Sequence, residues 1–560
     1  MKKNKFPKIK FEDNQIHSTF SDGQRTLEEI FEYNYYHDRL DLTLTDHVDK
    51  NTDWFDDYVK KIKTLRKKYP SFKAKIGCEV KILDNGTLNT TPAILKKAEV
   101  VLGSVHHFKN IKNLSTEELL EEEFRLTKLL AQNKTIDILA HPFSMVWRFF
   151  KANPPRTYIA EVYDLCLKNG VQFEYNKKNS PESVKKFVYE KVAEGKIDDF
   201  SFGSDMHVEL SDIGNSAFDV APPVSLLVTG AGAGVGQSII KSIKLSGHKI
   251  NLTTVDNSPL AAGLYRGDRI YLVPKNHEPE YIPRLVQICK KENIDLILVG
   301  TDVELEILSR HQKRIERTTG TKVIVSNLKA VQIADDKWKT VQFLKKSGFP
   351  YPRSWLSTKS AVLAKLKYPV IVKPRIGARS IGFQIIKNPE ELKNQLTQNK
   401  NLIIQEYLAD DNQEYTCGAL FWGDKNYGVI SAKRWLRHGD TYKALFKHDP
   451  GLEKFIAAVG KKLKINGPCN FQLRKTSRGP VIFEINCRFS GTTGAASHLG
   501  FNGVNALIQN LIFERKPQYL DFREAQMFRY WNEVFVHPEK VAILAKDSES
   551  SEIKSEVNIF

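Results

Sequence analysis

The sequence predicts a multidomain α/β protein in which short strands alternate with helices. Three observations predict this class. The chain has 560 residues, which is enough for two to four hydrophobic cores. Its composition, with 41% hydrophobic and 27% charged residues, is that of a globular protein. Short β-rich runs alternate with helical patterns, such as those at 115–131 and 157–169.

The first domain is expected over residues 1–215 as an α/β barrel or a barrel-like layer, because its short apolar runs are separated by longer helical patterns. A boundary is expected at 211–223, a stretch with a glycine, an asparagine and two prolines. A small doubly wound sheet is expected over 223–330, and its strands are predicted at 226–229, 252–255, 296–299 and 323–325.

The third domain is expected over residues 331–520 and mixes helices with strands. Its strands are predicted at 370–372, 402–405, 415–421 and 481–485. Residues 521–560 form a C-terminal extension, and the acidic stretch at 547–554 is expected to be a frayed tail.

The net charge of +18 is unevenly distributed. Residues 1–220 contain 34 basic and 34 acidic residues, and the other 340 residues contain 50 basic and 32 acidic ones. Such a field attracts nucleotides, phosphorylated or carboxylate substrates, or nucleic acid. Solvated lysines on helix faces explain much of the excess, so charge alone selects none of these partners.

A soluble cytoplasmic protein without membrane association is expected. The basic start of the sequence has no apolar segment behind it, as a signal peptide would have, and no apolar run approaches membrane-spanning length. The six cysteines show no CxxC spacing, which suits reduced thiols.

Metal-ligating residue types gather at the ends of apolar runs in the first domain, such as those at 42–44, 100–102 and 136–139. Donors at the ends of successive strands converge at one mouth of a barrel, where they can build a multinuclear metal centre. A single histidine is more often a packed residue than a ligand. The donors here are His17, His47, His106, His107, His141, His207, Asp22, Asp205 and Glu79.

The order of these donors resembles the polymerase-and-histidinol-phosphatase (PHP) family of metal-dependent phosphoesterases, over residues 1–210. The resemblance implies a distorted barrel with two or three Zn, Mn or Fe ions, and hydrolysis of a phosphoester in which His17 and Asp22 take part. The matching positions are His17, Asp22, His47, Glu79, His106, His141, Asp205 and His207.

One position departs from the PHP pattern. The family opens with His-x-His, and this chain has Gln15 at the first of these positions. An amide oxygen is a weaker ligand than imidazole. The alternatives are an active phosphoesterase and an impaired site that only stabilises the barrel.

A second group of chemically suited residues lies at 337–488. Lys337 is predicted to open a helix and Lys373 to end a strand, and the small-residue loop at 376–382 offers backbone amides to phosphate oxygens. In the last predicted strand Glu484, Asn486 and Arg488 alternate, so their side chains should share one face. Oxygen donors on this face, with Gln472 alongside, suit Mg²⁺, and Arg488 suits a transferring phosphoryl group.

This arrangement resembles the ATP-grasp family, most nearly its carbamoyl-phosphate-synthase-like branch, over residues 223–515. The resemblance implies that Lys337 and Lys373 contact the phosphates of ATP and that the loop with Arg379, Ser380 and Gly382 covers them. It implies adenine binding at Glu406 and Leu408 and ribose binding at Glu414. It also implies Mg²⁺ at Gln472, Glu484 and Asn486, with Arg488 at the reacting phosphate. A strand whose Glu–Arg pairs merely solvate an edge would leave the lysines and the glycine loop unexplained.

The glycine-rich segment at 229–237 suggests a dinucleotide site, helped by Asp256 after the next predicted strand. The spacing does not give GxGxxG, because position 235 is valine. Acceptor binding and plain helix–strand packing are the favoured alternatives to NAD.

The two resemblances together predict a bifunctional enzyme: an ATP- and Mg-dependent ligase that joins a small-molecule carboxylate to an amine through an acyl phosphate, and a phosphoesterase. Carbamoyl phosphate synthesis itself is rejected, because it needs two nucleotide halves and a glutaminase. The alternatives are a ligase with an impaired barrel, and a nucleotide- or nucleic-acid-processing protein of defence or repair. The basic C-terminal part motivates the last alternative, but the sequence lacks the aromatic-plus-basic stacking motifs expected of strand-binding modules.

Overall fold

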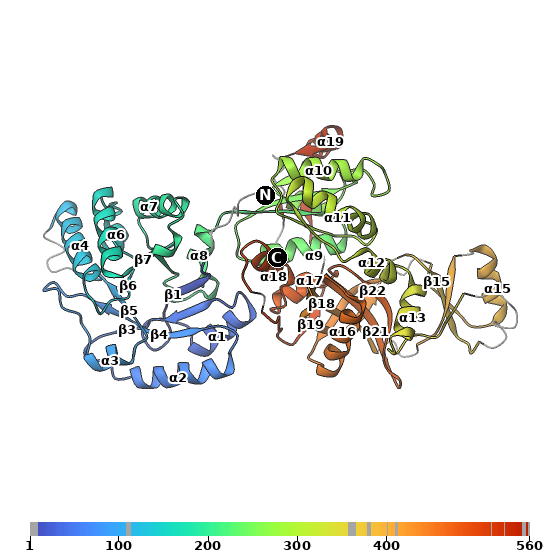
Figure 1. Cartoon of the computed structure of the whole chain (residues 1–560), viewed down its shortest axis with the longest axis horizontal. Helices are drawn as coiled ribbons and strands as arrows, with labels where there is room; N and C mark the ends of the chain where they lie inside the picture. The colour runs from blue at the N-terminus through green and yellow to red at the C-terminus, as the bar shows by residue number, and fades with distance from the viewer. Residues whose placement is uncertain are drawn as a thin grey trace. The chain divides into compact units, whose positions relative to one another are not determined.

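The computed structural model describes residues 9–107, 114–356, 366–377, 382–399, 401–408, 413–516, 518–530, 532–550 and 556–557. The chain forms two compact units (Figure 1). One contains Lys3–Pro222 with Gly247–Lys249, and the other contains Pro223–Ser246 with Ile250–Phe560. The division after Pro222 lies inside the stretch 211–223. No helix in the described part of the chain is long and apolar enough to cross a membrane.

The first unit is built on an eight-stranded sheet whose paired strands are all parallel. Backbone hydrogen bonds from Asp205 N to Gln15 O and from His17 N to Met206 O, both 2.9 Å, join its two ends into a barrel-like layer. The strands are β1 (Glu12–Ile16), β2 (Asp41–Leu44), β3 (His47–Val48), β4 (Ala74–Lys81), β5 (Val100–Ser104), β6 (Ile138–Leu139), β7 (Gln172–Asn176) and β8 (Phe200–Gly203).

Helices connect these strands: α1 (Leu27–Tyr36), α2 (Phe55–Lys68), α3 (Pro92–Lys97), α4 (Thr116–Ala131), α5 (Ser144–Phe150), α6 (Arg156–Asn169), α7 (Glu182–Ala193) and α8 (Asn215–Val220). Helix α4 begins with a capping box in which Ser115 and Glu118 each bind the other's backbone N–H. Its apolar face is buried at Leu119, Leu126 and Leu130. The bounds of α4 and α6 agree with the predicted helices to within one residue.

The second unit begins with a six-stranded sheet in the order β13-β12-β9-β10-β11-β25. All its pairs are parallel except that of β25 with β11. The strands are β9 (Val224–Val228), β10 (Ile250–Asp256), β11 (Arg269–Leu272), β12 (Leu296–Leu298), β13 (Lys322–Ile324) and β25 (Glu549–Ser550). The helices are α9 (Gly234–Lys244), α10 (Tyr281–Lys291), α11 (Leu305–Thr319) and α12 (Leu328–Asp335).

The expected frayed tail at 547–554 is wrong for its first residues. Helix α19 (Pro538–Asp547) leads directly into β25, where Glu549 pairs with Tyr271 of β11. The Glu549 carboxylate lies 2.7 Å from Lys291 Nζ and 3.5 Å from Arg284 Nη2. Glu549, in a stretch that the sequence predicts to be solvated, therefore lies in the sheet and forms ion pairs with basic residues of α10. Residues 551–554 lie outside the described residues.

Two antiparallel sheets complete this unit (Figure 1). The four-stranded sheet contains β14 (Ser354–Trp355), β15 (Val370–Pro374), β16 (Gln384–Ile386) and β17 (Leu402–Glu406). The six-stranded sheet contains β18 (Glu414–Trp422), β19 (Lys425–Arg437), β20 (Asp440–Phe446), β21 (Gly467–Thr476), β22 (Gly479–Asn486) and β23 (Ala525–Phe528). The remaining elements are α13 (Lys337–Lys346), α15 (Pro389–Gln398), α16 (Pro450–Leu463), α17 (Thr493–His498), α18 (Gly503–Leu511), β24 (Val534–Phe535) and β26 (Glu556–Val557).

Candidate active sites

The predicted donors of the first unit lie together at the carboxyl ends of its strands. Residues that are far apart in the sequence, such as His17 after β1 and Asp205 after β8, become neighbours because the sheet closes. Three groups of donors have ligand atoms within 4.8 Å of one another among the described residues and could each hold an ion. They are His17–Asp22–His47–His207, His47–Glu79–His106 and His17–Glu79–Asp205.

The fully buried carboxylate of Glu79 lies at the centre of this cluster. Its Oε2 lies 3.2 Å from His17 Nε2 and 3.6 Å from His47 Nδ1. Its Oε1 lies 2.8 Å from His106 Nε2 and 3.2 Å from His141 Nε2. Gln15, which was predicted to be part of this site, also lies in the cluster. Its Nε2 donates to Glu79 Oε2 at 2.9 Å. His107, in contrast, is exposed.

Several polar atoms in the cluster are buried without a hydrogen-bond partner among the described residues: both ring nitrogens of His17, Nδ1 of His47 and Oε1 of Gln15. Nε2 of His17 lies 3.2 Å from both Glu79 and Asp205, but without hydrogen-bond geometry. Unpartnered buried polar atoms are rare in proteins. Their concentration among imidazoles and carboxylates fits a group of residues that could hold metal ions.

The electrostatics of the cluster favour ionised carboxylates beside imidazoles. Burial raises the pKa of the Glu79 carboxyl, but the facing His47 and His106 imidazoles hold that pKa well below its ordinary value. Burial lowers the pKa of His47 to about 4, which keeps this ring neutral and able to coordinate a metal. Burial also disfavours charge on His141, but the hydrogen bond and charge of Glu79 outweigh burial and raise its pKa to about 9.

Three residues that the sequence analysis missed hold the donors in place. Glu174 of β7 accepts the backbone N–H of His141 at 2.5 Å, and Asn179 donates to the carboxylate of Asp205. Asp46 accepts the backbone N–H of Ser18 at 2.9 Å and thereby fixes the turn after His17. Glu174 and Asn179 have no spacing in the sequence that distinguishes them from surface residues, whereas Asp46 directly precedes the predicted donor His47.

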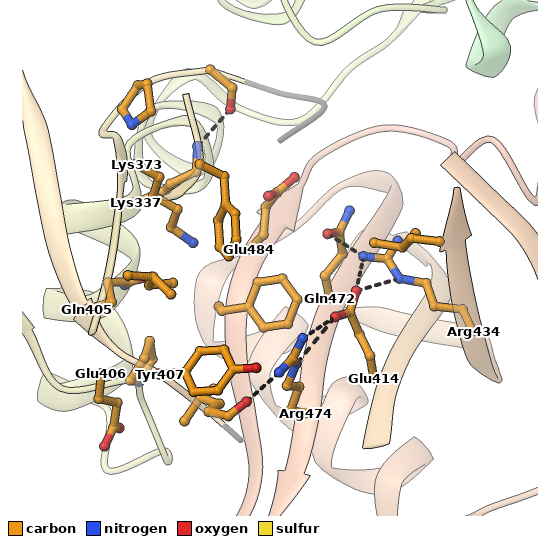
Figure 2. A pocket seen from close by; sticks show the side chains of 18 residues that line it. Lys337, Lys373, Gln405, Glu406, Tyr407, Glu414, Arg434, Gln472, Arg474 and Glu484 are labelled. Atoms are coloured by element: carbon orange, nitrogen blue, oxygen red, sulfur yellow. Dashed lines mark hydrogen bonds and ion pairs between the residues drawn. The ribbon is translucent and has the colours of Figure 1, made fainter. Parts of the chain in front are cut away.

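A pocket in the second unit lies between the four-stranded and six-stranded sheets (Figure 2). The predicted residues that line it are Lys337, Lys373, Glu406, Leu408, Glu414, Gln472 and Glu484. Gly382, Asn486 and Arg488 do not line it. Asn486 nevertheless shares a face of β22 with Glu484, because its Nδ2 donates to Glu484 Oε1 at 3.0 Å. Arg379 and Ser380 lie outside the described residues.

Two lysines bring positive charge to one side of this pocket (Figure 2). Lys337 begins α13 after the N-cap Asp336, and its Nζ donates to Gly377 O at 2.7 Å. Lys373 lies in β15 and is buried. Burial lowers the pKa of Lys373 to about 8, with Glu484 opposing and Lys337 reinforcing this shift. A buried ammonium near a second one suits a polyanionic ligand.

Glu414 is held between two arginines that the sequence analysis missed (Figure 2). Arg434 Nη2 donates to Glu414 Oε1 at 2.7 Å, and Arg474 Nη2 donates to its Oε2 at 2.9 Å. Arg434 also donates to Gln472 Oε1 at 2.8 Å. These arginines could not be assigned to the site from the sequence, because the strands that carry them, β19 and β21, were not predicted.

The side chain of Glu406 is already engaged beside the pocket. Its Oε1 accepts the backbone N–H of Arg353 at 2.8 Å and pairs with Arg478. The prediction that Arg488 continues the strand face of Glu484 and Asn486 is wrong. Strand β22 ends at Asn486, and the Arg488 side chain donates to Asp302 Oδ2 at 2.8 Å.

The glycine-rich segment connects β9 to α9 and is tightly packed. The backbone N–H of Gly232 donates to Asp256 Oδ2 at 2.9 Å, so the carboxylate that a dinucleotide ribose would need is bound to the loop itself. A Cβ on Gly236 would lie 2.3 Å from Gly230 O. These contacts favour helix–strand packing over NAD binding.

Three segments of the second unit match known families. Residues 226–324 match the PylC-like N-terminal domain, and residues 334–445 match the RimK-like ATP-grasp domain. Residues 398–534 match the family described as ATP-grasp in the biosynthetic pathway with Ter operon. The second unit therefore contains an ATP-grasp domain.

Among known proteins, this part of the chain is similar to carbamoyl phosphate synthases and to a ligase. The chain is 25% identical over 145 residues to a carbamoyl-phosphate synthase of Methanobrevibacter smithii, covering 25% of this chain and 38% of that protein. It is 24% identical over 270 residues to the 3-methyl-D-ornithine–L-lysine ligase of Methanosarcina mazei, and the match covers 47% of this chain and 65% of that protein. Thus the chain spans less than two thirds of either relative. A solved N5-carboxyaminoimidazole synthetase of Staphylococcus aureus with ADP is similar over 55% of this chain and 82% of its own, with a TM-score of 0.45 and 15% identity.

Proposed function

We propose that the protein is a bifunctional enzyme. Its second unit would be an ATP-dependent carboxylate–amine ligase, and its first unit a metal-dependent phosphoesterase. The ligase proposal depends mainly on one observation: Lys337 and Lys373 face the same pocket as the Glu484 carboxylate, which comes from the other sheet. Cations for phosphates and an oxygen donor for Mg²⁺ are thereby brought together.

In the proposed ligase reaction, a carboxylate oxygen attacks the γ-phosphorus of ATP and ADP leaves. Lys337 and Lys373 offset the charge of the phosphates, and Arg488 offsets charge on the transferring group. Glu484, Asn486 and Gln472 would hold Mg²⁺, which supplies further neutralisation when bound. The amine nitrogen then attacks the acyl carbon, phosphate leaves with the former carboxylate oxygen, and the nitrogen loses a proton. The substrates would be a small-molecule acid and amine.

For the first unit, the residues grouped around Glu79 would hold Zn²⁺, Mn²⁺ or Fe²⁺. Such ions, when bound, lower the pKa of water and neutralise a phosphoester. Gln15 Oε1 is buried and unpartnered, which leaves it available as a ligand. A second candidate function is a ligase with an inactive barrel, and the amide nitrogen of Gln15 favours it. Its Nε2 donates to Glu79 Oε2 and would compete with a metal for that oxygen.

The ligase proposal is tested with the full-length protein, Mg-ATP and a library of carboxylates and amines, with ADP formation and mass spectrometry as readouts. Lys373→Met and Glu484→Gln should each abolish ADP formation. Lys346→Met, which changes an exposed lysine of α13, is the matched control and should leave it intact. Undiminished ADP formation by Lys373→Met would refute the assignment of the pocket.

The barrel proposal is tested by the metal content of the purified protein and by hydrolysis of a phosphomonoester panel. Glu79→Gln should lose bound metal and hydrolysis together. Asp57→Asn, an exposed carboxylate on α2, should lose neither. Metal retained with no hydrolysis in the unaltered protein would favour the inactive-barrel alternative.

A further inference from the structure

A hollow of about 610 Å³ lies on the surface of the second unit and shares no lining residue with the nucleotide pocket. It is formed by the start of β19, helix α16, and the residues Lys516 and Tyr519. Four lysines line it: Lys425, Lys454, Lys461 and Lys516. All four are exposed. We refer to this feature as the lysine hollow.

The positive charge of the lysine hollow is not compensated from within. Among the described residues, no carboxylate oxygen lies within 4.0 Å of the ammonium group of any of its four lysines. Its one acidic lining residue, Glu453, is engaged elsewhere. Glu453 Oε1 accepts the backbone N–H of Asp449 at 3.2 Å and lies 3.3 Å from His448 Nδ1. Four ammonium groups around one concavity repel each other and attract an anion.

Aromatic and apolar surface accompanies the lysines. Tyr427 and Tyr519 line the hollow, and the Tyr519 side chain is 55% exposed. Pro450 and Ala457 add apolar contact area on the side of α16. Flat aromatic rings beside cations are the combination that binds bases and phosphates of nucleotides together.

Specific backbone contacts build this arrangement. Leu520 N donates to Tyr427 O at 2.6 Å and thereby anchors Leu520, the neighbour of Tyr519, on β19. Gly428 has φ +141°, and a Cβ there would lie 2.6 Å from Leu520 O. Glycine is therefore required where the two backbones meet. This close approach brings Tyr519 beside the start of β19, so the hollow results from defined packing.

We propose that the lysine hollow binds a phosphorylated ligand with an aromatic base: a free nucleotide or a stretch of single-stranded nucleic acid. The lysines contact phosphate oxygens and the tyrosines stack on bases. This site is separate from the proposed ATP pocket and from the barrel. It combines aromatic and basic residues from separate parts of the sequence, because its members come from 425–427 and 450–461 and from Lys516 and Tyr519.

The test uses full-length protein and a fluorescently labelled ten-nucleotide oligothymidylate, with binding followed by anisotropy. Lys454→Glu combined with Lys461→Glu should weaken binding at least tenfold. Lys462→Glu, an exposed lysine of α16 that does not line the hollow, is the matched control and should weaken it less than twofold. Binding should weaken with salt at about 0.7 log units per log unit of salt for each phosphate contacted.

Three further measurements sharpen the result. Tyr519→Ala should weaken binding several-fold without changing the salt dependence, because it removes stacking and no charge. Lys373→Met should leave binding unchanged, which separates the hollow from the ATP pocket. Displacement of the oligonucleotide by millimolar thymidine monophosphate would identify a free nucleotide as the ligand, and failure to displace it would identify a strand. Equal weakening by Lys462→Glu, or no binding by the unaltered protein, would overturn the proposal.

Discussion

Arg488 Nη2 lies 2.8 Å from Asp302 Oδ2, and this ion pair joins two parts of the chain 186 positions apart. Asp302 follows β12 of the parallel sheet, and Arg488 follows β22 of the six-stranded sheet. Arg488 is held further by its own donation to Phe489 O at 2.8 Å. The parallel sheet thus contributes directly to the position of the arginine that we propose to act on the transferring phosphoryl group.

Asp302→Asn should lower the turnover of the ligase reaction about 10- to 100-fold, because an arginine without its anchor stabilises developing charge less well. The KM for ATP should change less than about twofold, since Lys337 and Lys373 are untouched. Steady-state ADP formation checks both values. Partial recovery of turnover in Asp302→Glu would support a role of Asp302 in positioning Arg488. Unchanged turnover in Asp302→Asn, with a KM for ATP that rises about 10- to 100-fold instead, would contradict this role.

The affinity for Mg-ATP should depend on pH through Lys373. The pKa of this lysine is lowered to about 8 in the free protein, chiefly by burial. The protonated form binds phosphates, so affinity should be constant well below pH 8 and fall by up to about tenfold per pH unit above it. Calorimetric titrations at pH 7 and pH 9 measure the fall. In Lys373→Arg, which stays charged, a similarly steep fall would contradict the assignment.

Arg434→Leu should destabilise the second unit by about 3–5 kcal/mol, because it removes one partner of the buried Glu414 carboxylate. The exposed Arg437→Leu in the same strand is the matched control and should cost about 0.5 kcal/mol or less. Thermal unfolding of the two variants compares these losses. Equal melting temperatures would show that Arg474 alone satisfies Glu414.

Gln15→His should increase the metal content of the first unit and its phosphomonoester hydrolysis. The substitution supplies the imidazole expected from the PHP pattern and removes the amide N–H that binds Glu79. Elemental analysis and the phosphoester panel report on the two effects separately. Less bound metal than in the unaltered protein, with an unchanged melting temperature, would argue against Gln15 as the weak position.

The convergence of the donors in the first unit was predictable, because the carboxyl ends of parallel strands lie at the same edge of a sheet. His17, Glu79 and Asp205 could therefore be expected to meet without any structure. The supporting residues could not be predicted in this way. Glu174 and Asn179 act through single hydrogen bonds to His141 and Asp205, and such contacts depend on closure of the whole sheet.

The second unit shows where local patterns fail. Lys337 and Lys373 were predictable because each stands at the end of an element with a strong local pattern. Strand β19 was missed because its solvent-facing positions carry residues such as Lys433 and Arg437 among apolar ones. Strand β11 has only four residues, and its partner β25 has only two, which lie far away in the sequence and are accompanied by ion pairs from α10.

The ligase proposal is tested most directly by following oxygen from carboxylate to phosphate. The full-length protein is incubated with Mg-ATP, an amine mixture and a carboxylate library labelled with ¹⁸O, and the released phosphate is analysed by mass spectrometry. An acyl phosphate intermediate predicts one ¹⁸O atom in the phosphate for each ADP formed, and loss of both products in Glu484→Gln. Release of unlabelled phosphate alongside ADP and ligated product would contradict it.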